Sequence, residues 1–82
     1  MVYTVKTCNG GFPVALQDFD SYEAAEKFIE AAEQEDEQVT ALWMKEFPSE
    51  QPEYMTIGYA IYDEGDKQLA YFPPRKNVLL KN

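Results

Sequence analysis

The feature that most constrains the fold is an amphipathic segment that follows Phe19 and runs to about Glu37. Its apolar side chains recur three and four residues apart, the spacing that places them along one side of an α-helix. They are Tyr22, Ala25, Phe28, Ile29 and Ala32. Asp20 with Glu23 three residues later matches a capping box, and acids near a helix C-terminus are unfavourable. The pattern therefore predicts a helix that begins after Asp20 and ends by about Glu37.

Two strand patterns precede this helix. Residues 2–8 are rich in β-forming side chains, and residues 12–17 alternate larger apolar side chains with small or polar ones. Residues 9–11, Asn-Gly-Gly, lie between them, and such residues tolerate the positive φ values of tight hairpin turns. The sequence therefore predicts an N-terminal β-hairpin. Because proline lacks an amide donor, Pro13 is expected at a sheet edge or just before the second strand.

Three further strands are predicted after the helix, and they set the fold class. Apolar residues alternate with others in the segments 39–47, 54–62 and 68–72. The order ββαβββ predicts an α+β two-layer domain in which one amphipathic helix packs on a mostly antiparallel sheet. A β-grasp-like arrangement is the alternative. One helix covers one sheet face, so the other is left to solvent, to the C-terminal tail or to a partner.

The length of the chain, 82 residues, fits a single domain spanning 1–82, with 73–82 as a flexible or folded-back tail. No stretch approaches the roughly 18 apolar residues of a membrane span, and the N-terminus lacks a signal-peptide pattern. The lone cysteine, Cys8, has no partner for an internal disulfide. These observations predict a cytoplasmic protein that does not associate with membranes.

Several kinds of chemistry are disfavoured by the residues present. The chain has no histidine, so catalysis by histidine is excluded, and Cys8 has no histidine to activate its thiol. No glycine-rich phosphate loop and no calcium-loop ladder of ligands occurs. We therefore expect no enzymatic activity, no cofactor and no metal; an enzyme that uses carboxylates alone is the least favoured hypothesis. A net charge of −8 also speaks against direct binding to nucleic acid.

Acidic residues are concentrated in one part of the chain. Residues 18–37 hold nine acids and one lysine, whereas residues 67–82 hold four basic residues and no acid. Five glutamates step by three and four residues, which places them on one helix face, here called the glutamate face: Glu23, Glu26, Glu30, Glu33 and Glu37. Like charges at this spacing repel by a few tenths of a kcal/mol per pair. Either this face serves only solubility, or a cationic macromolecule supplies the missing counterions.

The ten residues from Phe19 to Phe28, FDSYEAAEKF, follow a glycine-turned hairpin in a small acidic chain. In this run, and in its size, charge and α+β character, the chain resembles small proteins encoded by phages and mobile elements, anti-CRISPR proteins among them. The resemblance implies stoichiometric inhibition of a host nuclease complex. It transfers no individual catalytic or binding residue to this chain.

Together these features predict a non-enzymatic acidic binding protein. Its glutamate face would occupy a basic, nucleic-acid-binding surface on a partner protein such as a CRISPR effector. Tyr54 and Tyr62 are the predicted aromatic anchors on the exposed side of the sheet. The alternative is a structural module that forms a homodimer through its sheet.

Overall fold

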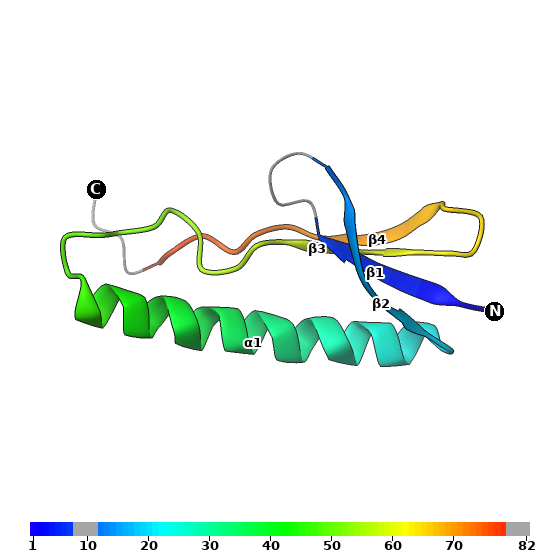
Figure 1. The fold of residues 1–82 in the computed structure, drawn as a ribbon, viewed down its shortest axis with the longest axis horizontal. Helices are drawn as coiled ribbons and strands as arrows, with labels where there is room; N and C mark the ends of the chain where they lie inside the picture. Colours follow the sequence, from blue (N-terminus) through cyan, green and yellow to red (C-terminus); the bar gives the residue numbers. More distant parts are fainter. Residues whose placement is uncertain (8–11, 79–82) are drawn as a thin grey trace.

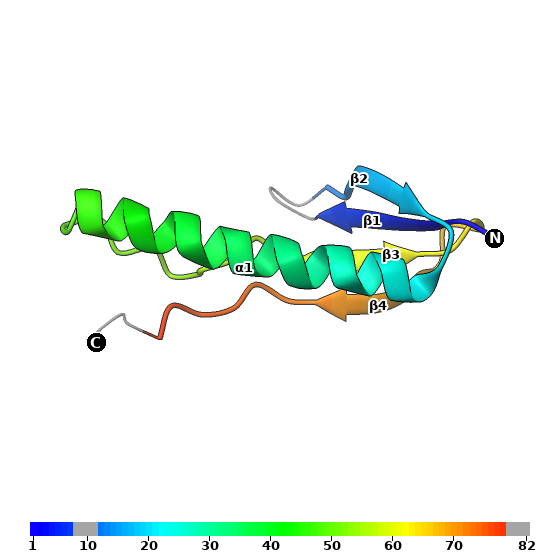
Figure 2. The same cartoon turned by 90° about the horizontal axis from the view of Figure 1, so that it is seen from below.

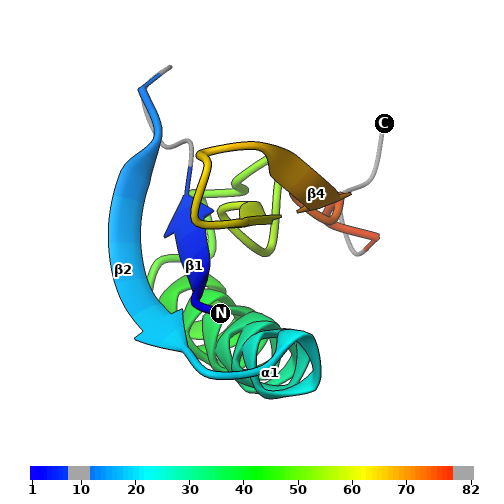
Figure 3. The same ribbon diagram turned by 90° about the vertical axis from the view of Figure 1, so that its right-hand side faces the viewer.

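The computed structural model describes residues 1–7 and 12–78. These residues form strands β1 (Tyr3–Thr7) and β2 (Val14–Phe19), helix α1 (Tyr22–Glu46), and strands β3 (Tyr59–Tyr62) and β4 (Gln68–Phe72). The strands make one sheet in the order β2-β1-β3-β4, and each neighbouring pair is antiparallel. Helix α1 lies against one face of the sheet (Figures 1 and 3). The predicted α+β two-layer domain is confirmed, and the antiparallel pairing of β1 with β3 differs from the parallel pair of a β-grasp sheet.

The core forms where the first half of α1 meets the sheet. Its fully buried centre consists of Val5, Ala25, Ile29, Tyr59 and Ile61. Around that centre pack the other members of the predicted apolar stripe, including Phe28, whose ring centroid lies 5.2 Å from that of Phe19. The helix begins one residue later than predicted: Ser21, rather than Asp20, is the N-cap, and its hydroxyl accepts from the amide of Ala24 at 3.1 Å.

The predicted helix end near Glu37 is wrong, and so is the strand predicted at 39–47. Helix α1 continues through both to Glu46. The apolar residues of 39–47 fit helical spacing as well as alternation, and tertiary contacts decide between the two. The Thr40 hydroxyl donates to the carbonyl of Met55 at 3.2 Å, and Met44 is buried. Because the helix continues, the acids at 35–37 lie in its middle, away from the unfavourable C-terminal dipole.

Helix α1 is much longer than the sheet it covers. At about 1.5 Å per residue, its 25 residues extend roughly 37 Å, whereas the longest strand, of six residues, extends roughly 20 Å. Figure 2 shows the second half of α1 continuing past the strands, and the domain is elongated, 45 × 22 × 16 Å. We call the part of α1 from Val39 onward the overhang.

Two irregular segments, 52–58 and 73–77, lie beside the overhang. They are joined by backbone hydrogen bonds from Met55 N to Arg75 O at 2.7 Å and from Asn77 N to Glu53 O at 2.8 Å. The strand predicted at 54–62 is therefore wrong in its first half: β3 starts at Tyr59, and Tyr54 forms only an isolated bridge with Lys76. Proline-rich flanks and the positive φ of Gly58 interrupt a regular ladder there. Cys8, the turn predicted at 9–11 and residues 79–82 lie outside the described residues.

Candidate functional site

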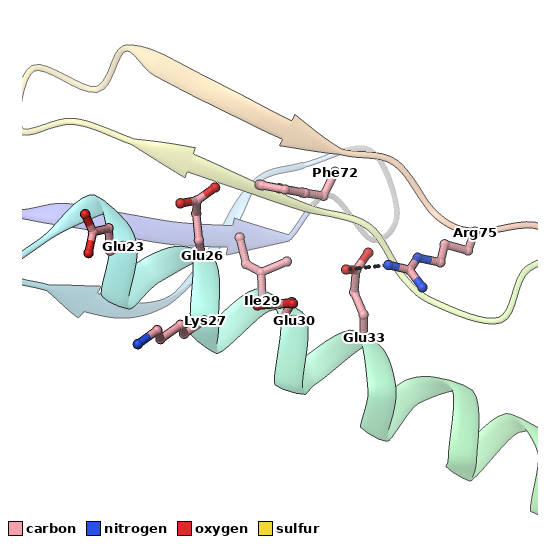
Figure 4. Close-up of a pocket in the computed structure, with 8 residues that line it drawn as sticks. All are labelled: Glu23, Glu26, Lys27, Ile29, Glu30, Glu33, Phe72 and Arg75. Carbon is pink, nitrogen blue, oxygen red and sulfur yellow. Dashed lines mark hydrogen bonds and ion pairs between the residues drawn. The ribbon is translucent and has the colours of Figure 1, made fainter.

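An open groove of about 440 Å³ lies between the first half of α1 and the end of β4. Figure 4 shows Glu26 and Ile29 pointing from α1 toward the side on which Phe72 and Arg75 lie. Ile29 and Phe72 provide the apolar part of its wall, and glutamates predominate among the rest. We call it the acidic groove, and it is lined by Glu23, Glu26, Lys27, Ile29, Glu30, Glu33, Phe72 and Arg75.

Arg75 neutralises two members of the glutamate face. Its guanidinium lies 3.3 Å from a carboxylate oxygen of Glu33 and 2.9 Å from one of Glu37. Glu33 is only 5% exposed. The backbone amide of Arg75 donates a hydrogen bond to the Thr56 hydroxyl oxygen at 2.9 Å, which fixes the position of Arg75. The expectation that all five carboxylates lack counterions within the chain is therefore wrong for Glu33 and Glu37. The segment that carries Arg75 folds back along α1, and no local spacing in the sequence indicates that path.

The other three members of the glutamate face have no ion-pair partner in the part of the chain that the structure describes. Glu23, Glu26 and Glu30 are exposed, and none of them forms an ion pair within residues 1–7 and 12–78. Lys27, four residues after Glu23, likewise makes no ion pair with the part of the chain that the structure describes. Three negative charges therefore line an open groove beside an apolar wall.

The two predicted aromatic anchors do not line the acidic groove. Tyr62 is half-buried on the sheet, where its hydroxyl donates to Gln68 at 3.1 Å and Lys6 lies 4.3 Å from its ring centroid. Tyr54 is 43% exposed and lies beside the overhang. Sequence reasoning did not assign Phe72 or Arg75 to the site. The sequence marks neither residue clearly: Phe72 is the last residue of a predicted strand, and Arg75 is one of four basic residues in the segment 67–82.

A buried tyrosine ties the sheet to the acidic middle of α1. The Tyr59 hydroxyl donates to a carboxylate oxygen of Asp36 at 2.6 Å. Burial raises the pKa of Tyr59 well above its ordinary value, and the hydrogen bond to Asp36 and the negative charges of Asp36, Glu33 and Glu35 raise it further. Since the folded pKa is the higher one, the unfolded chain releases this proton first as the pH rises. The stabilisation that comes from the raised pKa of Tyr59 is therefore fully present below pH ~10 and is lost as the pH rises above that value.

Replacing Tyr59 by phenylalanine is expected to lower the free energy of unfolding by about 1.5–3 kcal/mol at neutral pH, because a hydrogen bond to a charged group is lost. The variant should also lose less stability than the wild type between pH 7 and about pH 10.5. Urea denaturation followed by circular dichroism at both pH values measures these differences. Tyr71→Phe is the control, since Tyr71 is 53% exposed. Equal alkaline losses in wild type and Tyr59→Phe would contradict the assignment.

Within residues 1–7 and 12–78, no three cysteine, aspartate or glutamate side chains are grouped so that they could hold a metal ion. In the same residues, α1 included, no helix combines the length and apolar character needed to span a bilayer. Comparisons with protein-family models, with curated proteins and with solved structures find no match to this chain.

Proposed function

We propose that this chain is a non-enzymatic binding protein of the cytoplasm whose acidic groove receives cationic side chains of a partner protein. The observation that carries the proposal is the set of three exposed carboxylates, Glu23, Glu26 and Glu30, which have no ion pair in the described chain. Charges left uncompensated in an open groove attract a cationic partner at long range and fix its orientation on contact.

The groove suits lysine and arginine in particular. Both side chains have an apolar stem and a charged end, so the stem can pack on the half-buried Phe72 while the charged end meets the carboxylates. From Glu23 to Glu30 the helix rises roughly 10 Å. Proteins that bind nucleic acid place lysine and arginine side chains where they meet successive phosphates. The distances between neighbouring phosphates are comparable to the distances between these three glutamates along the helix.

The proposed partner is therefore a nucleic-acid-binding protein whose basic surface the groove occupies in place of phosphates. A CRISPR effector of the host is the specific candidate, following the resemblance to small phage-encoded inhibitors. Inhibition would be stoichiometric, because a protein that blocks a surface acts once per target. The net charge of −8 would speed the encounter at low salt.

The test is a displacement experiment after the partner has been identified by affinity capture from host lysate. We expect the protein to displace a fluorescently labelled oligonucleotide from that partner. The triple variant Glu23→Gln, Glu26→Gln, Glu30→Gln, here called the groove variant, is expected to displace it with about tenfold lower affinity. The reason is that each exposed charge contributes on the order of 0.5 kcal/mol. Affinity of the wild-type protein should also fall with added salt.

The control is a triple variant with the same change in charge, Asp20→Asn, Glu50→Gln, Glu53→Gln. These acids are exposed, lie outside the acidic groove and have no ion pair in the described chain. The control should keep most of the wild-type affinity. If both triple variants lose affinity equally, only net charge matters and the groove is not the binding site. A partner that keeps its oligonucleotide at saturating protein excludes the proposed inhibition.

A second candidate function, self-association through the sheet, has one observation in its favour. Both edge strands carry exposed apolar side chains: Leu16 is 45% exposed on β2, and Leu69 and Tyr71 are 41% and 53% exposed on β4. Edge strands also present unpaired backbone groups to a second chain. Sedimentation velocity at micromolar concentration separates the two candidates, because a sheet-mediated dimer would sediment as about twice the mass of the 9.5 kDa chain.

A further inference from the structure

The overhang of α1, together with its C-cap residue Phe47, exposes an apolar stripe that the sheet does not reach. Val39, Leu42, Trp43 and Phe47 are 59%, 65%, 51% and 45% exposed. They are spaced three and four residues apart, as on the covered side of an ordinary amphipathic helix. The rings of Trp43 and Phe47 contact each other, with centroids 4.5 Å apart. We call these four residues the overhang stripe.

The stripe continues onto the segment that runs beside α1. Tyr54 and Ile57, 43% and 42% exposed, share with Val39 the lining of a hollow of about 290 Å³. The apolar surface is therefore spread over a helix and a neighbouring segment, and it includes three aromatic side chains, Trp43, Phe47 and Tyr54. Single exposed apolar residues are ordinary, but a continuous patch of this kind marks a contact surface.

Acidic side chains border the patch. Glu35 lines the hollow beside Val39, and Glu46 follows Leu42 by four residues, on the same side of α1. Both are exposed and have no ion pair within the described residues. A second copy of the chain would bring like charges together at this border, and each copy carries a net charge of −8. Lys45, three residues after Leu42, opposes one of the two acidic charges, so Glu35, Glu46 and Lys45 together keep a net negative charge. That charge complements a partner that is apolar at its centre and basic at its rim.

We propose that the overhang stripe docks a cationic amphipathic helix of a partner protein. Rows of side chains three and four residues apart accept the matching rows of a second helix, with apolar side chains over Leu42 and Trp43. Lysine or arginine beside the apolar row meets Glu35 and Glu46. Exposed tryptophan that becomes buried is a frequent energetic centre of interfaces. The inference does not rest on the proposed function, since the sign of the partner's charge follows from Glu35 and Glu46 and the stripe shares no residue with the acidic groove.

The experiment uses Trp43 as its own reporter, because it is the single tryptophan of the chain. The probe is a synthetic amphipathic helical peptide of about 18 leucine and lysine residues, added to the full-length protein. We expect a saturable blue shift of the Trp43 emission as the indole leaves water. A peptide of the same composition in scrambled, non-amphipathic order should bind at least about tenfold more weakly.

Three variants decide where the peptide binds. Leu42→Glu is expected to weaken binding at least about tenfold, because it places a charge in the middle of the apolar stripe. Leu69→Glu adds the same charge on β4, where the wild-type side chain is 41% exposed, and should bind as the wild type does. The groove variant should also bind the peptide within about threefold of wild type. Circular dichroism confirms that each variant is folded.

Four outcomes would overturn the inference. They are equal binding by Leu42→Glu and wild type, equal binding of the ordered and scrambled peptides, and loss of binding in the groove variant alone. The fourth is a blue shift that grows with protein concentration without peptide, which would assign the stripe to a second copy. The proposed function is tested separately, because displacement of nucleic acid by the groove variant does not depend on the peptide result.

Discussion

Replacing Gly58 with alanine is expected to lower the free energy of unfolding by about 3 kcal/mol. Gly58 has φ of 83°, and a Cβ atom there would lie 2.8 Å from Cδ of Pro74. The left-handed conformation costs about 1–2 kcal/mol for other residues, and overpacking adds about 1–3 kcal/mol. The backbone has little room to shift, because the Gly58 carbonyl accepts a buried hydrogen bond from the Thr7 hydroxyl at 2.8 Å. Urea denaturation followed by circular dichroism measures the loss.

Gly65→Ala is the matched control for this prediction. Gly65 has no left-handed φ, and the nearest atom to an added Cβ is a carboxylate oxygen of Asp63 at 3.4 Å. Its substitution should change the free energy of unfolding by no more than about 0.5 kcal/mol. Similar losses in the two variants would mean that the close approach of Gly58 to Pro74 does not limit stability.

Replacing Arg75 with methionine is expected to cost about 2–3 kcal/mol of stability. The variant leaves the Glu33 carboxylate, 5% exposed, without its ion-pair partner. Removing one member of a fully buried pair costs about 3–5 kcal/mol; the expected loss is smaller here because the Arg75 side chain is 57% exposed. The pair to Glu37 at 2.9 Å is lost as well. Thermal and urea denaturation at neutral pH report the change.

Lys76→Met tests whether the loss is specific to the Arg75 position. Lys76 is also exposed, and it makes no ion pair with the described residues. Its replacement should be close to neutral. Adding Glu33→Gln to Arg75→Met should recover part of the stability, since an uncharged amide costs less to bury than a carboxylate. If the double variant is less stable than Arg75→Met alone, Glu33 does not carry the unpaired charge that explains the loss.

The first half of α1 was predictable because its local signals agreed to within one residue. The apolar residues from Tyr22 to Ala32 show helical spacing only, and the structure places Ala25 and Ile29 in the core. The second half was not predictable in this way. Residues 39–47 satisfy both alternation and helical spacing, so their periodicity does not choose between strand and helix. The choice depends on Met44 and Thr40, which contact segments more than ten residues away in the chain.

The candidate site, like helix α1, has properties that the local sequence predicts and others that only tertiary contacts decide. The concentration of glutamates on α1 follows from their spacing alone, but their electrostatic state does not. Glu33 and Arg75 are 42 residues apart, and Glu37 and Arg75 are 38 apart. Contacts over such separations depend on the path of the intervening chain, which local spacing does not encode. The groove formed with Phe72 depends on that path as well.

From the sequence alone follow an α+β domain, an amphipathic helix after a hairpin and an acidic face on that helix, because these properties depend on residues within a few positions of one another. Only the tertiary structure decided that Arg75 neutralises Glu33 and Glu37 and that Glu23, Glu26 and Glu30 line a groove. It also decided that the four residues of the overhang stripe are exposed while Met44 is buried. The physical reason is the mismatch between a 25-residue helix and strands of at most six residues. A sheet that short covers only half of α1 and leaves the rest to the returning C-terminal segment and to solvent.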